Sequence, residues 1–158
     1  MSRLIFLLLL ACVSCQNVSK DALTNYDLEI PSQIWKLPKE LDEISGITMS
    51  NNENTFCIND EEGIIYEYNL GNKTVQNQFT FGKNNDYEDV AIVADCLFVL
   101  QSNGTLFSIN SKKEVTKHST FLTQKQDTEG LCYDEKNHQL LIACKNKVAV
   151  KITIYSFD

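Results

Sequence analysis

Residues 127–130 read DTEG, and this short acidic stretch has two relatives upstream, EISG at residues 43–46 and DYED at residues 86–89. Each copy begins with an acidic residue and closes with Gly or Asp, residue types that favour turns. The copies recur at intervals of roughly 40 to 45 residues, which is the signature of a chain built from structural repeats. The recurrence predicts equivalent units that each begin with this motif.

A second motif keeps the same phase. GIIYEYN at residues 63–69, GTLFSIN at 104–110 and ITIYSFD at 152–158 align aromatic on aromatic. Between the motifs lie short runs rich in Val, Ile, Phe and Tyr, bounded by Asn, Asp, Gly and Lys clusters, a pattern typical of strands. Four strands fit into each repeat, and a four-stranded antiparallel unit of roughly 40 to 50 residues is a β-propeller blade.

We therefore predict an all-β fold, a partial β-propeller of about three four-stranded antiparallel blades from an originally larger ring. The folded domain covers residues 37–158, with blades at about 42–82, 86–122 and 127–158. The third unit ends after three strands. A propeller needs roughly four or more blades to close its ring, so we expect the chain to be a C-terminally truncated fragment.

Three local features complete the expected domain. One face of the last unit, carrying either Leu141 or the pair Leu140 and Ile142, would have no following blade to cover it. Gly63 in the NDEEG turn is expected to take a positive φ, as is the glycine of QSNG at residues 101–104. Trp35, just before the first blade, is expected to plug the ring closure or to cover an edge.

The N-terminal stretch MSRLIFLLLLACVSC, residues 1–15, has the features of a bacterial lipoprotein signal peptide. A basic start is followed by an apolar run of roughly 10 residues, too short to span a bilayer. Cysteines preceded by small residues end the run, and we expect Cys15 to be acylated, with Cys12 as the alternative. A plain signal peptide remains a further alternative. Residues 16–36 are polar and aperiodic and predict a tether. The expected location is the cell envelope, on its periplasmic or outer-membrane face.

The charge and the cysteine content narrow the range of partners and metal sites expected for this protein. The net charge of −7, with 14 scattered basic residues, argues against a nucleic-acid partner. The downstream cysteines form no CxxC pair, so a zinc cluster is not expected. We interpret Cys57 and Cys144 as small buried apolar residues. The disulfide state of the four stays open; they are Cys57, Cys96, Cys132 and Cys144.

The acidic motif falls at the start of the first strand of each unit, and in a propeller this strand lines the central channel. Repetition therefore brings the motif side chains toward one axis. In one interpretation they accept backbone hydrogen bonds and lock neighbouring blades. In another they form a carboxylate ring that binds a divalent cation such as Ca²⁺; in a third, a pair acts in acid–base catalysis. The candidates are Glu43, Asp86 and Asp127 in one column and Glu88 and Glu129 in a second, where Ser45 stands in the first unit.

Five stretches in this order resemble the SdiA-regulated family of bacterial envelope propellers: LPKELDEISGIT, NDEEGIIYEYNL, FGKNNDYEDVAIV, FVLQSNGTLFSI and DTEGLCYDEKNHQLLIACK. The resemblance covers residues 37–145. It implies a propeller roughly twice this length, often lipid-anchored, and implies no particular activity. A looser similarity links the chain to lactonase-like and phytase-esterase-like propellers, some of which bind a divalent cation through a glutamate that matches Glu88 and Glu129. Ser45 departs from that pattern.

From these observations we expect a lipid-anchored binding or scaffold module that takes a protein or glycan ligand at the propeller mouth. The alternative is a divalent-metal-dependent hydrolase of the lactonase or phytase-esterase type. No GxSxG, HExxH or P-loop motif is present in the sequence. We therefore expect binding rather than catalysis.

Overall fold

The computed structural model describes residues 29–50, 53–145 and 152–158. The chain divides into two units, Met1–Ile34 and Trp35–Asp158, and the strands found within the described ranges belong to the second. Both candidate acylation sites, Cys12 and Cys15, lie outside the described residues, as does most of the expected tether. Within the described ranges, no helix has the length and apolar character needed to cross a membrane.

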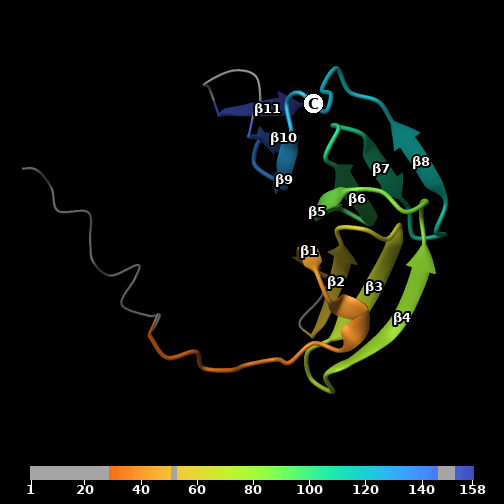
Figure 1. Cartoon of the computed structure of the whole chain (residues 1–158), viewed down its shortest axis with the longest axis vertical. Coiled ribbons are helices and arrows are strands. Elements are labelled where there is room, and N and C mark those ends of the chain that lie inside the picture. Colours follow the sequence, from red (N-terminus) through yellow and green to blue (C-terminus); the bar gives the residue numbers. More distant parts are fainter. Residues whose placement is uncertain (1–28, 51–52, 146–151) are drawn as a thin grey trace, which may run out of the picture. The chain divides into compact units, whose positions relative to one another are not determined.

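The second unit is built from three antiparallel sheets (Figure 1), as predicted for a partial propeller. The first contains β1 (Ile44–Met49), β2 (Asn54–Asn59), β3 (Ile64–Asn69) and β4 (Thr74–Thr80). The second contains β5 (Tyr87–Val93), β6 (Cys96–Gln101), β7 (Leu106–Ile109) and β8 (Val115–His118). The third contains β9 (Thr128–Asp134), β10 (Gln139–Cys144) and β11 (Thr153–Phe157). A short 3₁₀ turn, η2 (Lys39–Leu41), precedes β1.

The first strands of the three blades lie side by side, β1 against β5 and β5 against β9, while β4 and β8 lie at the outer edge (Figure 1). Within each blade the strands follow chain order through hairpins. The repeat predicted from sequence is therefore a repeat in space, and the motif that begins each unit is placed at equivalent positions of neighbouring inner strands.

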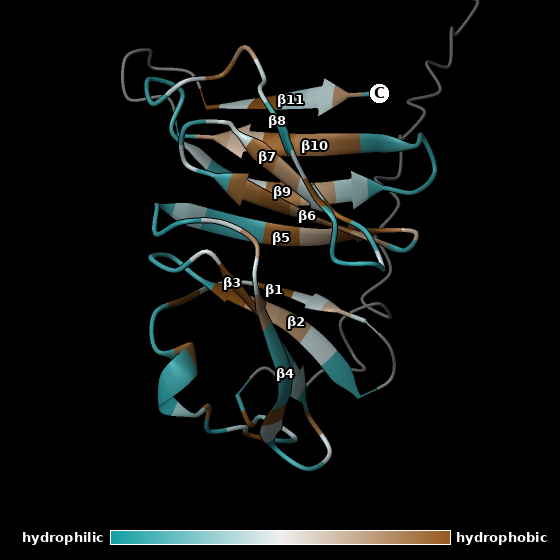
Figure 2. Cartoon of the chain, turned by 90° about the vertical axis from the view of Figure 1, so that its right-hand side faces the viewer, coloured by the Kyte–Doolittle hydropathy of each residue, from teal (hydrophilic) through white to brown (hydrophobic). Residues whose placement is uncertain are grey.

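Apolar side chains pack between neighbouring blades. Figure 2 shows that hydrophobic residues lie along the strands of all three blades. Ile58 and Ile65 of the first blade pack with Val90 and Val99 of the second. Leu100 of the second packs with Leu131 and Ile142 of the third. Because side chains alternate along a strand, the burial of Ile142 leaves Leu141 on the opposite face. The sequence left open whether the uncovered face carries Leu141 or the pair Leu140 and Ile142. Among the described residues, it is the face carrying Leu141 that no other blade covers.

Trp35 covers a blade face. It packs, with Leu41, on Cys57, Tyr66 and Tyr68, on the side of the first blade that faces away from the second. Its indole Nε1 donates a hydrogen bond of 2.8 Å to the Leu70 carbonyl. The segment before β1 is thereby tied to the domain.

Gly104 and Gly63 are needed for different reasons. Gly104 has φ = 83°, as expected for its turn. The expectation for Gly63 is wrong, because its φ is not positive. A Cβ at Gly63 would lie 2.4 Å from the Gly82 carbonyl oxygen. Close approach of two backbones, rather than turn conformation, therefore requires glycine there.

The four cysteines of the domain are all free thiols in this structure. Cys57 and Cys144 are buried within apolar clusters, in keeping with their interpretation as small apolar residues, whereas Cys132 is exposed.

Candidate functional site

A β-bulge occurs at the same position in all three blades. On β1 the pairing with β2 shifts between Ile44 and Gly46. On β5 the pairing with β6 shifts between Tyr87 and Asp89. On β9 residues Thr128 and Gly130 pair with consecutive residues of β10. The extra residue of each bulge, which we call the bulge residue, is Ser45, Glu88 or Glu129.

A bulge re-aims the side chain of its extra residue relative to the regular strand. The second column of motif residues predicted from sequence is therefore the set of bulge residues. It is placed at the start of three adjacent inner strands, which is the arrangement a shared polar surface requires.

The first column acts through its backbone. In each blade the carbonyl oxygen of this residue accepts a hydrogen bond from the N–H group of the residue that directly follows the second strand. The pairs are Glu43 with Asp60, Asp86 with Ser102 and Asp127 with Lys145, and their N···O distances are 3.3, 2.9 and 2.9 Å. Glu43 and Asp127 have φ of 59° and 51°, a left-handed conformation that is uncommon for residues other than glycine. The motif thus fixes where each inner strand begins.

Asp60 and Ser102, which directly follow the second strands of their blades, also bond to the next blade. The Asp60 carbonyl accepts from the Tyr87 N–H at 2.9 Å, and the Ser102 carbonyl accepts from the Thr128 N–H at 3.0 Å. Together with the bonds to Glu43, Asp86 and Asp127, these form a ladder of main-chain hydrogen bonds that crosses all three blades. Main-chain atoms of the motif residues Glu43, Asp86 and Asp127 thus take part in the locking of neighbouring blades.

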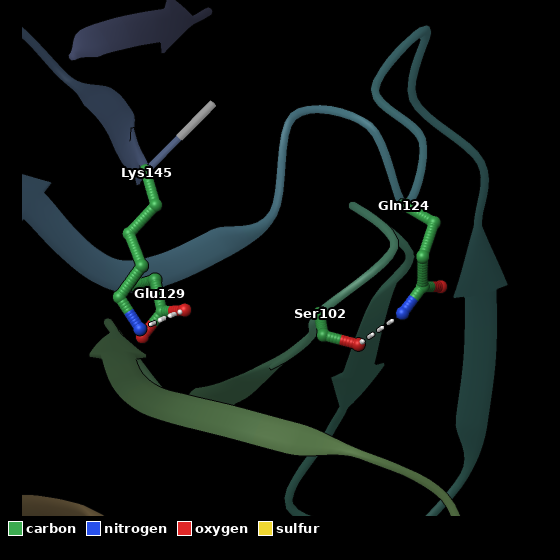
Figure 3. A network of polar contacts seen from close by, with 4 residues as sticks. All are labelled: Ser102, Gln124, Glu129 and Lys145. Atoms are coloured by element: carbon green, nitrogen blue, oxygen red, sulfur yellow. Dashed lines mark hydrogen bonds and ion pairs between the residues drawn. The ribbon is translucent and has the colours of Figure 1, made fainter. Parts of the chain in front are cut away.

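Glu88 lies at the centre of a charged group. Partial burial raises its pKa from 4.5 to about 7, helped by repulsion from Glu129 and Asp86 and by a hydrogen bond with Asp86, and Lys145 acts in the opposite direction. The Lys145 Nζ forms an ion pair of 2.7 Å with Glu129 Oε1 (Figure 3). That contact with Glu129 raises the pKa of Lys145, so its ammonium group stays charged.

The structure thus brings three of the five predicted carboxylates, Asp86, Glu88 and Glu129, together with Lys145 into what we call the charged cluster. Asp127 is buried, with 5% of its surface exposed, and contributes to the raised pKa of Lys145. Glu43 is exposed at the start of the first blade and does not contribute to the pKa shift of Glu88.

Within the part of the chain that the structure describes, no three His, Cys, Asp or Glu side chains are arranged to hold a metal ion. The charged cluster instead contains the ammonium group of Lys145, which supplies positive charge next to Glu129. A cation placed between carboxylates lowers their mutual repulsion, and Lys145 partly does this for Glu129 and Glu88.

No protein-family model matches the chain, and no curated protein matches it. Among solved structures, virginiamycin B lyase from Staphylococcus aureus matches 77% of this chain and 43% of its own length, with a TM-score of 0.55 and 12% identity. A streptogramin B lyase matches with a TM-score of 0.54 and 13% identity, over 73% of this chain and 40% of its own. A catalytically inactive variant of the Staphylococcus aureus lyase with quinupristin matches with a TM-score of 0.58 and 13% identity, over 80% and 44%.

The chain is a partial β-propeller. At 12 and 13% identity the likeness shows the fold alone. The propeller chain described here also spans less than half the length of these neighbours. The resemblance to the SdiA-regulated family, which no family model supports, stays a prediction.

Two residues of this partial propeller were missed by the sequence reasoning. The Asp89 carboxylate accepts hydrogen bonds from the Val90 and Leu131 N–H groups, both at 2.8 Å, and so joins the second blade to the third. Burial raises the pKa of Asp89, and the two N–H bonds oppose that rise. The sequence could have indicated Asp89, because it occupies the motif position at which the other two copies have glycine. The second missed residue is Lys145, and no motif in the sequence indicated a role for it.

The two histidines of the sequence, His118 and His138, are exposed and do not belong to the charged cluster. His118 Nε2 lies 2.8 Å from Ser108 Oγ, and His138 Nδ1 lies 3.1 Å from the Tyr133 hydroxyl oxygen.

The raised pKa of Glu88 predicts a pH-dependent stability. Between pH 4.5 and about 7 the folded propeller holds a proton that the unfolded chain has released, so the free energy of unfolding falls as pH rises through this window. Allowing for solvent screening, we expect Glu88→Gln, which is neutral throughout, to be more stable than the natural chain by about 1–2 kcal/mol at pH 8 and equal to it near pH 4. Urea unfolding across this pH range measures the difference.

Glu135→Gln, which removes an exposed carboxylate outside the charged cluster, is the matched control and should leave the pH profile unchanged. Parallel profiles for the natural chain and Glu88→Gln would show that Glu88 titrates alike in the folded and unfolded states.

Proposed function

We propose that this partial propeller is a non-catalytic binding module of the SdiA-regulated type, held at the bacterial cell envelope by a lipid on Cys15. Its ligand class is a protein or a glycan. The observation that carries the proposal is the engagement of the charged cluster in bonds within the domain. Glu129 pairs with Lys145, Glu88 bonds with Asp86, and the backbones of Asp86 and Asp127 belong to the inter-blade ladder.

A second feature favours binding. A groove of about 340 Å³ lies between the first and second blades, at the end of the inner strands opposite the charged cluster. Phe56, Phe79 and Leu97 contribute apolar surface to it, and Asp95 and Lys113 contribute charge. Mostly apolar concave sites with a few polar groups are typical of ligand recognition. The propeller therefore offers a charged surface at one end and an apolar groove at the other.

The alternative, a divalent-metal-dependent hydrolase, rests on the cluster of carboxylates Asp86, Glu88 and Glu129. Calorimetric titration of the full chain with Ca²⁺ separates the two functions. For a binding module we expect no saturable heat in the micromolar range, and no turnover of a γ-lactone, p-nitrophenyl phosphate or quinupristin with Ca²⁺ added. The binding module would be contradicted by stoichiometric Ca²⁺ binding that is lost in Glu88→Gln and Glu129→Gln, together with turnover of one of these substrates. Turnover of the lactone or of p-nitrophenyl phosphate would establish the hydrolase, and turnover of quinupristin would establish a lyase.

The anchor has its own test. In a bacterial host fed an alkyne fatty acid, the natural chain is expected to become labelled and to sediment with membranes, because acyl chains on one cysteine give stable anchoring at about 0.8 kcal/mol per CH₂ group. Cys15→Ser should lose both the label and membrane association, whereas Cys12→Ser should retain them. Labelling lost only in Cys12→Ser would move the anchor to that residue, and no labelling in any form would remove it.

A further inference from the structure

The groove between the first and second blades has two walls of different character. On the first blade, strand register places Phe56 of β2, Glu67 of β3 and Asn77 of β4 side by side on one face. All three line the groove, and this row is called the first wall. It sets a carboxylate beside an aromatic ring, and both groups attract a cation.

The wall formed by the second blade is aliphatic. Register pairs Ile92 of β5 with Leu97 of β6, and Leu97 with Ile109 of β7. These three residues also line the groove, and their row is called the second wall. They belong to the same inter-blade cluster as Phe56, so the two walls face each other. The second wall offers the groove hydrocarbon surface and no polar side chain.

The Glu67 carboxylate is half-buried in the first wall and has no countercharge. Its Oε1 accepts one hydrogen bond, from Asn54 Nδ2 at 3.3 Å, and it forms no ion pair within the described ranges. A carboxylate opposite an aliphatic wall loses part of its hydration, a cost that a cation placed beside it would offset. Asp95, exposed on the turn between β5 and β6, adds a second carboxylate at the rim of the groove.

A lysine of this chain already uses the groove in part. The Lys113 Nζ lies 5.0 Å from the centroid of the Phe79 ring, and both residues line the groove. The Lys113 N–H donates a 2.8 Å hydrogen bond to the Asn110 carbonyl, which fixes the turn that carries it. Lys113 lies over this ring and makes no ion pair with Glu67. The groove therefore accepts a cation on one aromatic ring and leaves the place beside Glu67 and Phe56 open.

We propose that the groove binds a lysine or arginine side chain of a protein partner, with its stem on the second wall and its charged group at Glu67 beside Phe56. Long basic side chains combine an apolar stem with a charged end, which matches this pairing of walls. The net charge of −7 attracts a basic partner. The inference rests on the proposed binding function and narrows its ligand class to a protein, because a neutral glycan would leave the Glu67 carboxylate uncompensated.

A titration of the ¹⁵N-labelled full chain, followed by amide chemical shifts and in mild detergent if the protein is membrane-bound, tests the proposal. The probes are N-acetyl-arginine amide and N-acetyl-lysine amide, whose capped ends imitate a residue within a protein. We expect saturable shift changes confined to amides around the groove, with a Kd on the order of 1 mM. N-acetyl-norleucine amide keeps the stem but lacks the charge, and it should bind about 10-fold more weakly.

Glu67→Gln removes the charge and keeps an oxygen for the bond from Asn54. It should weaken binding of the two basic probes by about 10-fold and leave the affinity for the norleucine probe unchanged, which damage to the groove would not. Glu61→Gln is the matched control. It removes an exposed carboxylate next to Asp60, at the end of the blades where the inner strands begin, and should leave all affinities unchanged.

The proposal is overturned if neither basic probe gives saturable groove shifts up to about 20 mM, or if the norleucine probe binds as tightly as they do. Equal weakening by Glu67→Gln and Glu61→Gln would also overturn it. Groove shifts caused by an N-acetylglucosamine tetramer and by no basic probe would assign the groove to a glycan. Free arginine that binds about 10-fold more tightly than the capped form would assign it to a free amino acid. These outcomes leave the binding module itself in place, since that function fails through Ca²⁺-dependent turnover at the charged cluster.

Discussion

Replacement of Tyr87 by alanine is expected to lower the free energy of unfolding by about 4 kcal/mol. Tyr87 is 1% exposed at the start of β5. Its ring packs edge-to-face on Phe81 and Phe107, with centroids 4.9 and 6.0 Å away. These rings belong to the cluster that joins the first two blades, so truncation opens a cavity at the junction. Urea unfolding followed by circular dichroism measures the loss.

Tyr87→Phe is the matched control. It keeps the ring contacts and removes the hydroxyl that donates a 2.7 Å hydrogen bond to the Lys83 carbonyl, a loss worth about 1 kcal/mol. A loss of similar size in both variants would place the contribution of Tyr87 in the hydroxyl group and contradict the assignment of this junction to aromatic packing.

The second large effect is expected from Gly46→Val. A Cβ at Gly46 would lie 2.9 Å from both the Asp89 Cα and the Val90 backbone nitrogen. Because these are backbone atoms of the neighbouring inner strand, they yield only if the two blades separate. Overpacking of this kind costs about 1–3 kcal/mol, and we expect the upper end of that range, measured by thermal and urea unfolding.

The repeat supplies a control at the equivalent position of the third blade. A Cβ at Gly130 would meet only the Ala143 Cβ, at 3.5 Å, an ordinary contact. Gly130→Val should therefore change the free energy of unfolding of the isolated chain by less than about 1 kcal/mol. Equal losses at Gly46 and Gly130 would mean that strand conformation, rather than the approach of the next blade, selects glycine.

The fold could be predicted because its signals are periodic. The acidic motif and the aromatic motif mark the start and the third strand of each blade, and alternating apolar residues fix the strands between them. Strand pairing within each blade followed from the hairpins. Which face of the third blade is uncovered did not follow, because Leu141 and Ile142 are both apolar, and only the packing of Ile142 in one cluster with Leu100 of the second blade decides between them.

The candidate site could be predicted only in part. The column containing Glu88 and Glu129 was found from spacing, but its bulge was not, since an extra residue in a strand leaves no mark in composition. The left-handed backbone of Glu43 and Asp127 was missed because neither residue type demands it. Lys145 was missed because its role depends on the end of β10 lying beside Glu129.

The hydrogen-bonded ladder has a consequence for how such a chain can change over generations. Its rungs use only peptide groups, of residues such as Asp60, Tyr87 and Ser102, so a donor position accepts any residue that has a backbone N–H, which excludes only proline. A stretch of gene encoding one unit can accordingly be copied or deleted in multiples, and each new unit arrives with its connection to its neighbour already specified. Side chains on the exposed rims are then free to diverge while the joints between units are inherited unchanged.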